Sequence, residues 1–364
     1  MYLKWLCLFL FSSGMLFSQN PQNTDFSLGA QYYYGVLLRH NKNIAHLVRE
    51  QPQGIILSYN RKTFGDSYWQ QAYGYPDWGV SFIYQNFGYE VLGENYGVYG
   101  HFNFYFLNRK LKFRVAEGIA YNTNPFDLED NFKNVAYGSS LMASTYFLLQ
   151  YEEAQIFKDV GLQVGLSFVH HSNGSVKAPN TGTNVFGLTL GMSYNPTSKD
   201  SLSYQKREVS QDFSEPIKIN LELRGGINES DYFNLGRHPF YVVSAYADKR
   251  LNYKSTLQFG VEYFVSEFLK EEIEYVLASF PNRLDGPKDH KRVGVMLGHE
   301  FSIGKLGLPT QLGYYVYWPY EYESRVYARI GVKYYVTSKL FAGVYVKSHA
   351  ANAEHIAFGG GIRL

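Results

Sequence analysis

The sequence has 364 residues, a formal net charge of +2 and only 18% charged residues, so it lacks the broad basic field typical of nucleic-acid binding. Aromatic residues make up 18% of the chain, including 34 tyrosines and 27 phenylalanines, a composition that favours β-structure. The absence of a Walker loop, a dinucleotide fingerprint and zinc-type Cys and His spacing argues against the common nucleotide-binding and structural-zinc classes.

The N-terminus has the three parts of a secretory signal peptide. Lys4 is a short basic region, residues 5–17 are apolar, and Ser18 suits the position before cleavage, so we predict a signal peptide over residues 1–18. Cys7 lies inside it and is the single cysteine of the chain, which excludes disulfides from the exported protein. The rest of the sequence has no run of about twenty apolar residues, but a closed β-barrel crosses a membrane without one.

Several segments alternate apolar and polar residues with the period of a β-strand. Residues 217–226, IKINLELRGG, alternate throughout, as do residues 256–265 and 325–336. Short and long links alternate between the predicted strands, as periplasmic turns and external loops do in outer-membrane barrels. The chain ends in a predicted strand, HIAFGGGIRL, which would close such a barrel.

The fold class predicted is an all-β, transmembrane, antiparallel up-and-down β-barrel in the bacterial outer membrane. We expect about 14–16 strands in a single barrel over residues 19–364, with external loops. A soluble sandwich also alternates, but the pattern of link lengths favours the barrel. The polar segment 195–216 could join two barrels or domains; because alternation continues on both sides of it, one barrel is the simpler interpretation.

The segment 167–184, SFVHHSNGSVKAPNTGTN, carries the best candidates for catalytic residues. In the strand that ends here, His170 and Ser172 share the apolar, lipid-facing side, whereas His171 faces the lumen. Asn184 begins the next strand on the same outer side. The link between these two strands is one of the long ones, so the group is expected at the external rim.

These residue types in this pattern suit ester hydrolysis. Ser172 would be the nucleophile and His170, whose imidazole has an ordinary pKa near 6.5, the base that activates it. Asn184 would orient the imidazole, and the backbone N–H groups of Asn173 and Gly174 could form an oxyanion hole. The alternative is an ordinary polar barrel rim, where His, Ser and Asn are also found.

The motif FVHHSNG…KAPNTGTN…GLTLGMSY resembles the lipid A 3-O-deacylase (PagL) family, and residues 65–84, GDSYWQQAYGYPDWGVSFIY, look like the larger acyloxyacyl-hydrolase-type members. The resemblance implies an outer-membrane esterase that removes an acyl chain from lipid A in the outer leaflet. It implies that Ser172 is the nucleophile and His170 the base, with Asn173 and Gly174 in the oxyanion region.

One position departs from the family pattern. The acidic member of the family's triad would fall at Asn184, and an Asn at this spacing resembles outer-membrane phospholipase A instead. That family also binds calcium, but the corresponding positions here, Ser175 and Asn180, do not predict a metal site. Glu117 is a remote candidate for the missing acid, expected two strands away and lower in the barrel than His170.

The predicted partner is therefore an outer-leaflet lipid, lipid A or a phospholipid, with no nucleic acid and with an oligomer possible. No cofactor is expected; calcium would enter only with the phospholipase alternative. A porin or transport barrel without enzymatic activity is the other open alternative.

Overall fold

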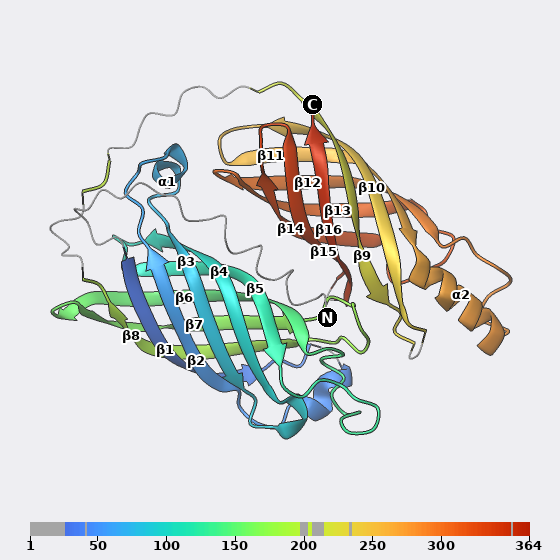
Figure 1. The fold of residues 1–364 in the computed structure, drawn as a ribbon, viewed down its shortest axis with the longest axis horizontal. Helices are drawn as coiled ribbons and strands as arrows, with labels where there is room; N and C mark the ends of the chain where they lie inside the picture. Colours follow the sequence, from blue (N-terminus) through green and yellow to red (C-terminus); the bar gives the residue numbers. More distant parts are fainter. Residues whose placement is uncertain (1–25, 41, 197–202, 206–214, 233–234, 351) are drawn as a thin grey trace, which may run out of the picture.

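The computed structural model describes residues 26–40, 42–196, 203–205, 215–232, 235–350 and 352–364, and the predicted signal peptide lies outside these ranges. The described residues form two closed antiparallel barrels of eight strands each (Figure 1).

The first barrel is built from consecutive strands that pair with their neighbours in sequence. These are β1 (Phe26–Leu37), β2 (Gln53–Arg61), β3 (Asp77–Asn86), β4 (Glu94–Phe106), β5 (Leu111–Asn122), β6 (Leu141–Phe157), β7 (Val160–Ser172) and β8 (Thr183–Tyr194). It closes where β1 pairs with β8, in a register that places Leu28 opposite Tyr194.

The second barrel repeats this plan. Its strands are β9 (Lys218–Glu229), β10 (Arg237–Arg250), β11 (Ser255–Ser266), β12 (Lys291–Ile303), β13 (Leu306–Tyr317), β14 (Val326–Tyr335), β15 (Leu340–His349) and β16 (Asn352–Arg363). It closes where β16 pairs with β9, with Phe358 opposite Gly225.

The prediction of a single barrel over residues 19–364 is therefore wrong, although sixteen strands lie within the predicted range. Each half closes on its own first strand, so β16 meets β9 and not β1. The physical reason is that alternation reports only which side of a strand faces lipid, and this is the same in one large barrel or two small ones. The segment 195–216 therefore joins two barrels.

The outer faces of both barrels are apolar and their interiors are polar. Leu28, Tyr32 and Leu57 are among many large apolar side chains exposed on the first barrel, and Leu221, Phe259 and Leu312 on the second. This surface fits a bilayer, whose hydrocarbon core accepts apolar side chains and requires every backbone group to be paired.

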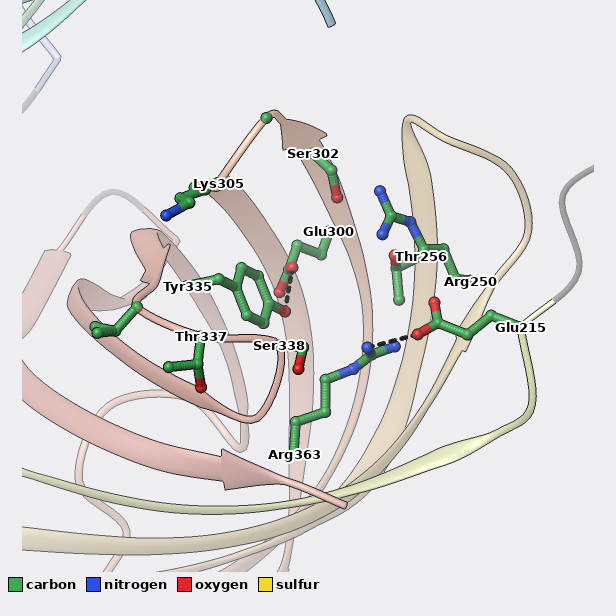
Figure 2. Close-up of a pocket in the computed structure, with 12 residues that line it drawn as sticks. Glu215, Arg250, Thr256, Glu300, Ser302, Lys305, Tyr335, Thr337, Ser338 and Arg363 are labelled. Atoms are coloured by element: carbon green, nitrogen blue, oxygen red, sulfur yellow. Dashed lines mark hydrogen bonds and ion pairs between the residues drawn. The ribbon is translucent and has the colours of Figure 1, made fainter. Parts of the chain in front are cut away.

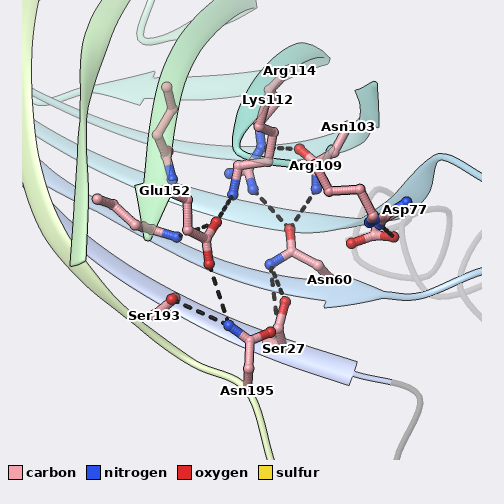
Figure 3. Close-up of polar contacts among 12 residues, drawn as sticks. Ser27, Asn60, Asp77, Asn103, Arg109, Lys112, Arg114, Glu152, Ser193 and Asn195 are labelled. Atoms are coloured by element: carbon pink, nitrogen blue, oxygen red, sulfur yellow. Dashed lines mark hydrogen bonds and ion pairs between the residues drawn. The ribbon is translucent and has the colours of Figure 1, made fainter. Parts of the chain in front are cut away.

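Hydrogen-bonded side chains fill the interior of the first barrel (Figure 3). Arg114 donates to Oδ1 of Asn60 at 2.7 Å and to Asn103 at 2.7 Å, and Lys112 forms an ion pair with Glu152 at 3.1 Å. Eight strands enclose a space that side chains can fill completely.

The interior of the second barrel is more strongly charged. Glu262 is buried and paired with both Arg224 and Arg329, and it also accepts hydrogen bonds from Tyr327 at 2.7 Å and Ser244 at 2.8 Å. The buried carboxylate of Glu262 thus has partners of opposite sign, which offset the cost of burying its charge in a low-dielectric interior.

Helical segments lie in the links between strands. They are η1 (Lys42–Leu47), α1 (Tyr68–Ala72), η2 (Glu90–Leu92) and α2 (Glu267–Ser279). Within the described ranges, none of the helices is both long and apolar enough to cross a membrane.

The two ends of each barrel differ. We call the end that carries the β7–β8 link the loop end of the first barrel, and the end that carries α1 its turn end. In the second barrel the loop end carries α2 and the turn end carries the short links after β10, β12 and β14.

At the turn ends, α1 and the residues beside it contact the second barrel. Tyr73 donates a hydrogen bond to the carbonyl oxygen of Ser302 at 2.5 Å, and its ring lies 5.2 Å from that of Phe301. The rings of Tyr68 and Tyr253 lie 4.3 Å apart. Like ends of the two barrels thus meet, as two barrels inserted in one membrane require (Figure 1).

Candidate active site

The alternation of β7 decides which way its histidines point. Leu162 and Val164 are exposed on the outer face, and His170 lies on that face six residues beyond Val164. His171 is 1% exposed and its Nε2 lies 3.3 Å from Oε1 of Gln85 inside the barrel. The predicted separation of the two histidines, His170 outward and His171 inward, is confirmed.

The register of β7 with β8 brings Asn184 beside His170. The two residues are directly paired, and Oδ1 of Asn184 lies 2.6 Å from Nδ1 of His170. Because an amide oxygen can only accept, this contact assigns the proton to Nδ1 and leaves Nε2 as the basic nitrogen. The predicted contact between Asn184 and His170 is therefore present.

Ser172 ends β7 and is 8% exposed. Its hydroxyl donates to Oδ1 of Asn180 at 3.0 Å, and it accepts a hydrogen bond from the N–H of Gly174 at 3.1 Å. The hydroxyl is thus turned toward Asn180 and away from the partnership with His170 that the sequence predicts.

Gly182 lies between Ser172 and His170. A Cβ added at this glycine would be 3.4 Å from Cβ of Ser172 and 3.5 Å from Cε1 of His170. Both side chains therefore border one small space that the absence of a side chain at Gly182 keeps open. To meet the imidazole, the Ser172 hydroxyl would have to leave Asn180.

The backbone after Ser172 forms a tight turn. Gly174 and Ser175 have positive φ angles of 61° and 59°, and the N–H of Val176 donates to the carbonyl oxygen of Asn173 at 3.3 Å. The N–H of Asn173 donates to Asn180 at 2.9 Å, whereas that of Gly174 points at Ser172. Of the two predicted oxyanion donors, Gly174 is the one aimed at the serine oxygen.

Asn180 is a site residue whose role the sequence did not reveal. Its Oδ1 accepts hydrogen bonds from both Ser172 and Asn173. Position 180 lies in a polar loop rich in Asn, Thr and Gly, and nothing in the local pattern marks one of these residues as the partner of Ser172.

Glu117 lies on the same outer face, in the same cross-strand row as His170. Register places Glu117 opposite Thr145, and Thr145 opposite His170. Glu117 is thus two strands away from His170, as predicted. Its carboxylate accepts from Oγ1 of Thr145 at 2.8 Å.

The residues corresponding to a calcium site are engaged within the protein. Oγ of Ser175 donates to the carbonyl oxygen of Ala353 at 2.5 Å, and Asn180 holds Ser172 and Asn173. Over the described ranges, no group of three or more His, Cys, Asp or Glu side chains is arranged to hold a metal ion.

A cavity of about 410 Å³ lies elsewhere, at the turn end of the second barrel (Figure 2). Glu300, Tyr335 and Arg363 are among its lining residues, and Tyr335 and Arg363 bind Glu300 and Glu215, respectively. It lies at the opposite end of the fold from Ser172 and His170, so it is not part of this site.

Two family models match the chain, one for each barrel. Residues 53–193 match the model described as Lipid A 3-O-deacylase (PagL), and residues 217–364 match the one described as Acyloxyacyl hydrolase, C-terminal domain. The first match covers β2 to β8 and the second covers all of the second barrel, so the boundary between the models falls in the link between barrels.

The fold and these matches define a β-barrel enzyme of the bacterial outer membrane. The first barrel carries the lipid A 3-O-deacylase (PagL) domain and the second carries the acyloxyacyl hydrolase C-terminal domain, both domains of an ester hydrolase family.

Solved barrels are also similar. The crystal structure of the outer membrane enzyme PagL is 18% identical, with a TM-score of 0.28, and the match covers 45% of this chain and 97% of that one. A mutant of Rh. blastica porin is 11% identical over 93% of this chain and 100% of its own, with a TM-score of 0.20. Omp33 of Acinetobacter baumannii is 8% identical over 93% and 98%, with a TM-score of 0.19.

The fold of this chain follows from its own strand pairing. None of the curated proteins matches the chain in sequence.

Proposed function

We propose that the first barrel is a serine esterase that removes an ester-linked acyl chain from lipid A in the outer leaflet. Ser172 is the nucleophile, His170 the general base and Asn184 the residue that orients the imidazole. The N–H of Gly174, freed when the Ser172 hydroxyl turns, stabilises the oxyanion, and the N–H of Asn173 joins it once Oδ1 of Asn180 releases it.

The observation that carries this proposal is the contact between Nδ1 of His170 and Oδ1 of Asn184, 2.6 Å long, beside Ser172 on the outer face of the barrel. A third residue that holds Nδ1 in its protonated form leaves Nε2 free to accept the proton of a serine, as in Ser-His-Asp and Cys-His-Asn sites. Together with membership of an ester hydrolase family, this supports the assigned roles.

In the first half of the reaction, the Ser172 hydroxyl turns from Asn180 to Nε2 of His170. The imidazole removes its proton while Oγ attacks the ester carbonyl, and the resulting oxyanion accepts hydrogen bonds from backbone N–H groups of the turn. The intermediate then expels the sugar alkoxide, which takes the proton from His170, and leaves the acyl chain on Ser172.

In the second half, water attacks the acyl-serine ester with His170 again acting as base. The fatty acid leaves, and the proton returns to Ser172. The position of His170 on the outer face supports a lipid substrate, because an acyl chain in the leaflet can approach that face sideways without entering the barrel.

The test is mass spectrometry of lipid A and of phospholipids incubated with the purified wild-type protein, Ser172→Ala and His170→Ala. We expect wild-type protein to release a hydroxyacyl chain from lipid A, and each substitution to lower the rate by at least about 10²-fold while the barrel still folds. Full activity in both variants would contradict the assigned roles. Release from phospholipid alone would identify a phospholipase A-like enzyme in place of a lipid A deacylase.

A further inference from the structure

The β7–β8 loop, residues 173–182, is held by the second barrel as well as by its own. The N–H of Ala178 donates to Oε2 of Glu229 at 3.0 Å, and the N–H of Glu229 donates to the carbonyl oxygen of Ser175 at 2.9 Å. Glu229 is the last residue of β9, so one residue of the second barrel both accepts from this loop and donates to it.

Two further contacts come from β16. Oγ of Ser175 donates to the carbonyl oxygen of Ala353 at 2.5 Å. The backbone of Gly174 lies directly on Ile356, since a Cβ added at Gly174 would be 2.3 Å from Cγ1 of that side chain. The turn that follows Ser172 is therefore fixed from the side by two strands of the other barrel.

These contacts bear on the chemistry because they act on the residues next to Ser172. Gly174, whose N–H points at the serine oxygen, is the residue that packs on Ile356. This N–H binds the nucleophile oxygen itself, so a shift of the turn moves both Ser172 and the proposed oxyanion donor, and a displacement of about 1 Å can cost roughly 10²-fold in rate.

We propose that the second barrel positions the β7–β8 loop for catalysis in the first barrel, and that Glu229 is the positioning residue through which it does so. This inference rests on the proposed function of Ser172 and His170. Glu229 touches neither of these residues; it acts by fixing the backbone at Ser175 and Ala178, and so the direction of the Gly174 N–H.

The contacts at the opposite ends of the barrels support a fixed arrangement. The hydrogen bond between Tyr73 and Ser302 and the ring contact between Tyr68 and Tyr253 join the barrels at their turn ends. Because the barrels touch at both ends, neither contact can act as a free pivot. The second barrel can therefore hold the β7–β8 loop in place.

The experiment measures kcat and KM for acyl release from lipid A in mixed micelles, using the full chain. Glu229→Ala removes the acceptor for the Ala178 N–H, whereas Glu229→Gln keeps an acceptor oxygen and removes only the charge. We expect kcat to fall about tenfold in Glu229→Ala with KM little changed, and Glu229→Gln to keep kcat within about twofold of wild type.

The matched control is Glu274→Ala, which removes an exposed carboxylate from α2 at the loop end of the same barrel and should leave kcat unchanged. Wild-type kcat in Glu229→Ala would overturn the inference. Equal losses in Glu229→Ala and Glu229→Gln would overturn it too, because a positioning hydrogen bond is retained by the amide.

Ser172→Ala in the same assay separates the two proposals. If Ser172→Ala is fully active, the proposed function fails whatever Glu229 does. If Ser172→Ala is inactive and Glu229→Ala behaves as wild type, only the positioning role fails.

A second variant keeps the inference testable should Glu229→Ala fail to fold. Ile356→Ala removes the side-chain atoms that pack against Gly174. Its control is Phe358→Ala, two residues further along the same strand on the outward face. We expect kcat to fall severalfold in Ile356→Ala alone. Equal kcat in Ile356→Ala and Phe358→Ala would overturn the positioning role.

Discussion

Asn184 and Glu117 lie in one row across the outer face of the first barrel, with His170 and Thr145 between them. Only the first of the two touches the imidazole: Asn184 lies 2.6 Å from Nδ1 of His170, whereas Glu117 binds Thr145. An uncharged amide can hold the ring in the orientation needed for proton transfer, although it cannot stabilise the imidazolium as a carboxylate does.

We therefore expect Asn184→Ala to lower kcat by about 10²-fold, because the imidazole loses the acceptor that fixes its orientation and its Nδ1 proton. Glu117→Gln, the matched change in the same row, should leave kcat within about twofold of wild type. Initial rates of acyl release on mixed micelles check both values. A large loss in Glu117→Gln with normal activity in Asn184→Ala would reverse the assignment.

At the scale of the strands, buried charges join elements of the second barrel that are not paired in the sheet. Glu262 on β11 pairs with Arg224 on β9 and with Arg329 on β14, which crosses the lumen between strands that are not neighbours in the sheet. The carboxylate compensates the buried guanidinium of Arg329 and shares that of Arg224 with Glu222.

Replacing this carboxylate tests its contribution. Glu262→Ala leaves Arg224 and Arg329 without their common partner, and removal of one member of a buried ion pair costs about 3–5 kcal/mol. We expect a clear fall in the temperature at which the folded barrel loses its β-signal in circular dichroism. Glu274→Ala on α2, exposed to solvent, should leave that temperature unchanged. Equal melting of the two variants would show that the pair is not stabilising.

At the scale of the whole molecule, closure into two small barrels decides whether the interior is an open channel. A barrel of sixteen strands leaves an aqueous channel, whereas eight strands leave a space that side chains fill. Arg114, Tyr99 and Tyr146 are fully buried in the first barrel, and Arg224 and Arg292 in the second.

We therefore expect no steady porin-like conductance when the protein is inserted in a planar bilayer. Single-channel recording at a fixed voltage checks this, with a sixteen-stranded porin inserted in the same bilayer as the control. Regular conductance steps from purified protein would contradict the filled interiors and would support the transport alternative.

The sequence by itself determined the strands, their faces and the direction of the key side chains. A period of two follows from local backbone geometry, so alternation placed His170 outward, His171 inward and Asn184 on the side of His170 without any knowledge of the fold. The motif from His170 to Asn184 also indicated the family whose model matches residues 53–193.

Only the tertiary structure decided how many barrels these strands close and what surrounds Ser172. Closure depends on which distant strands pair, β1 with β8 and β9 with β16, and alternation is the same for either closure. The contacts of Asn180 and Glu229 with the β7–β8 loop depend on how a loop folds back and how two barrels meet. Such contacts have no period in the sequence, because each is set by the path of the backbone in space.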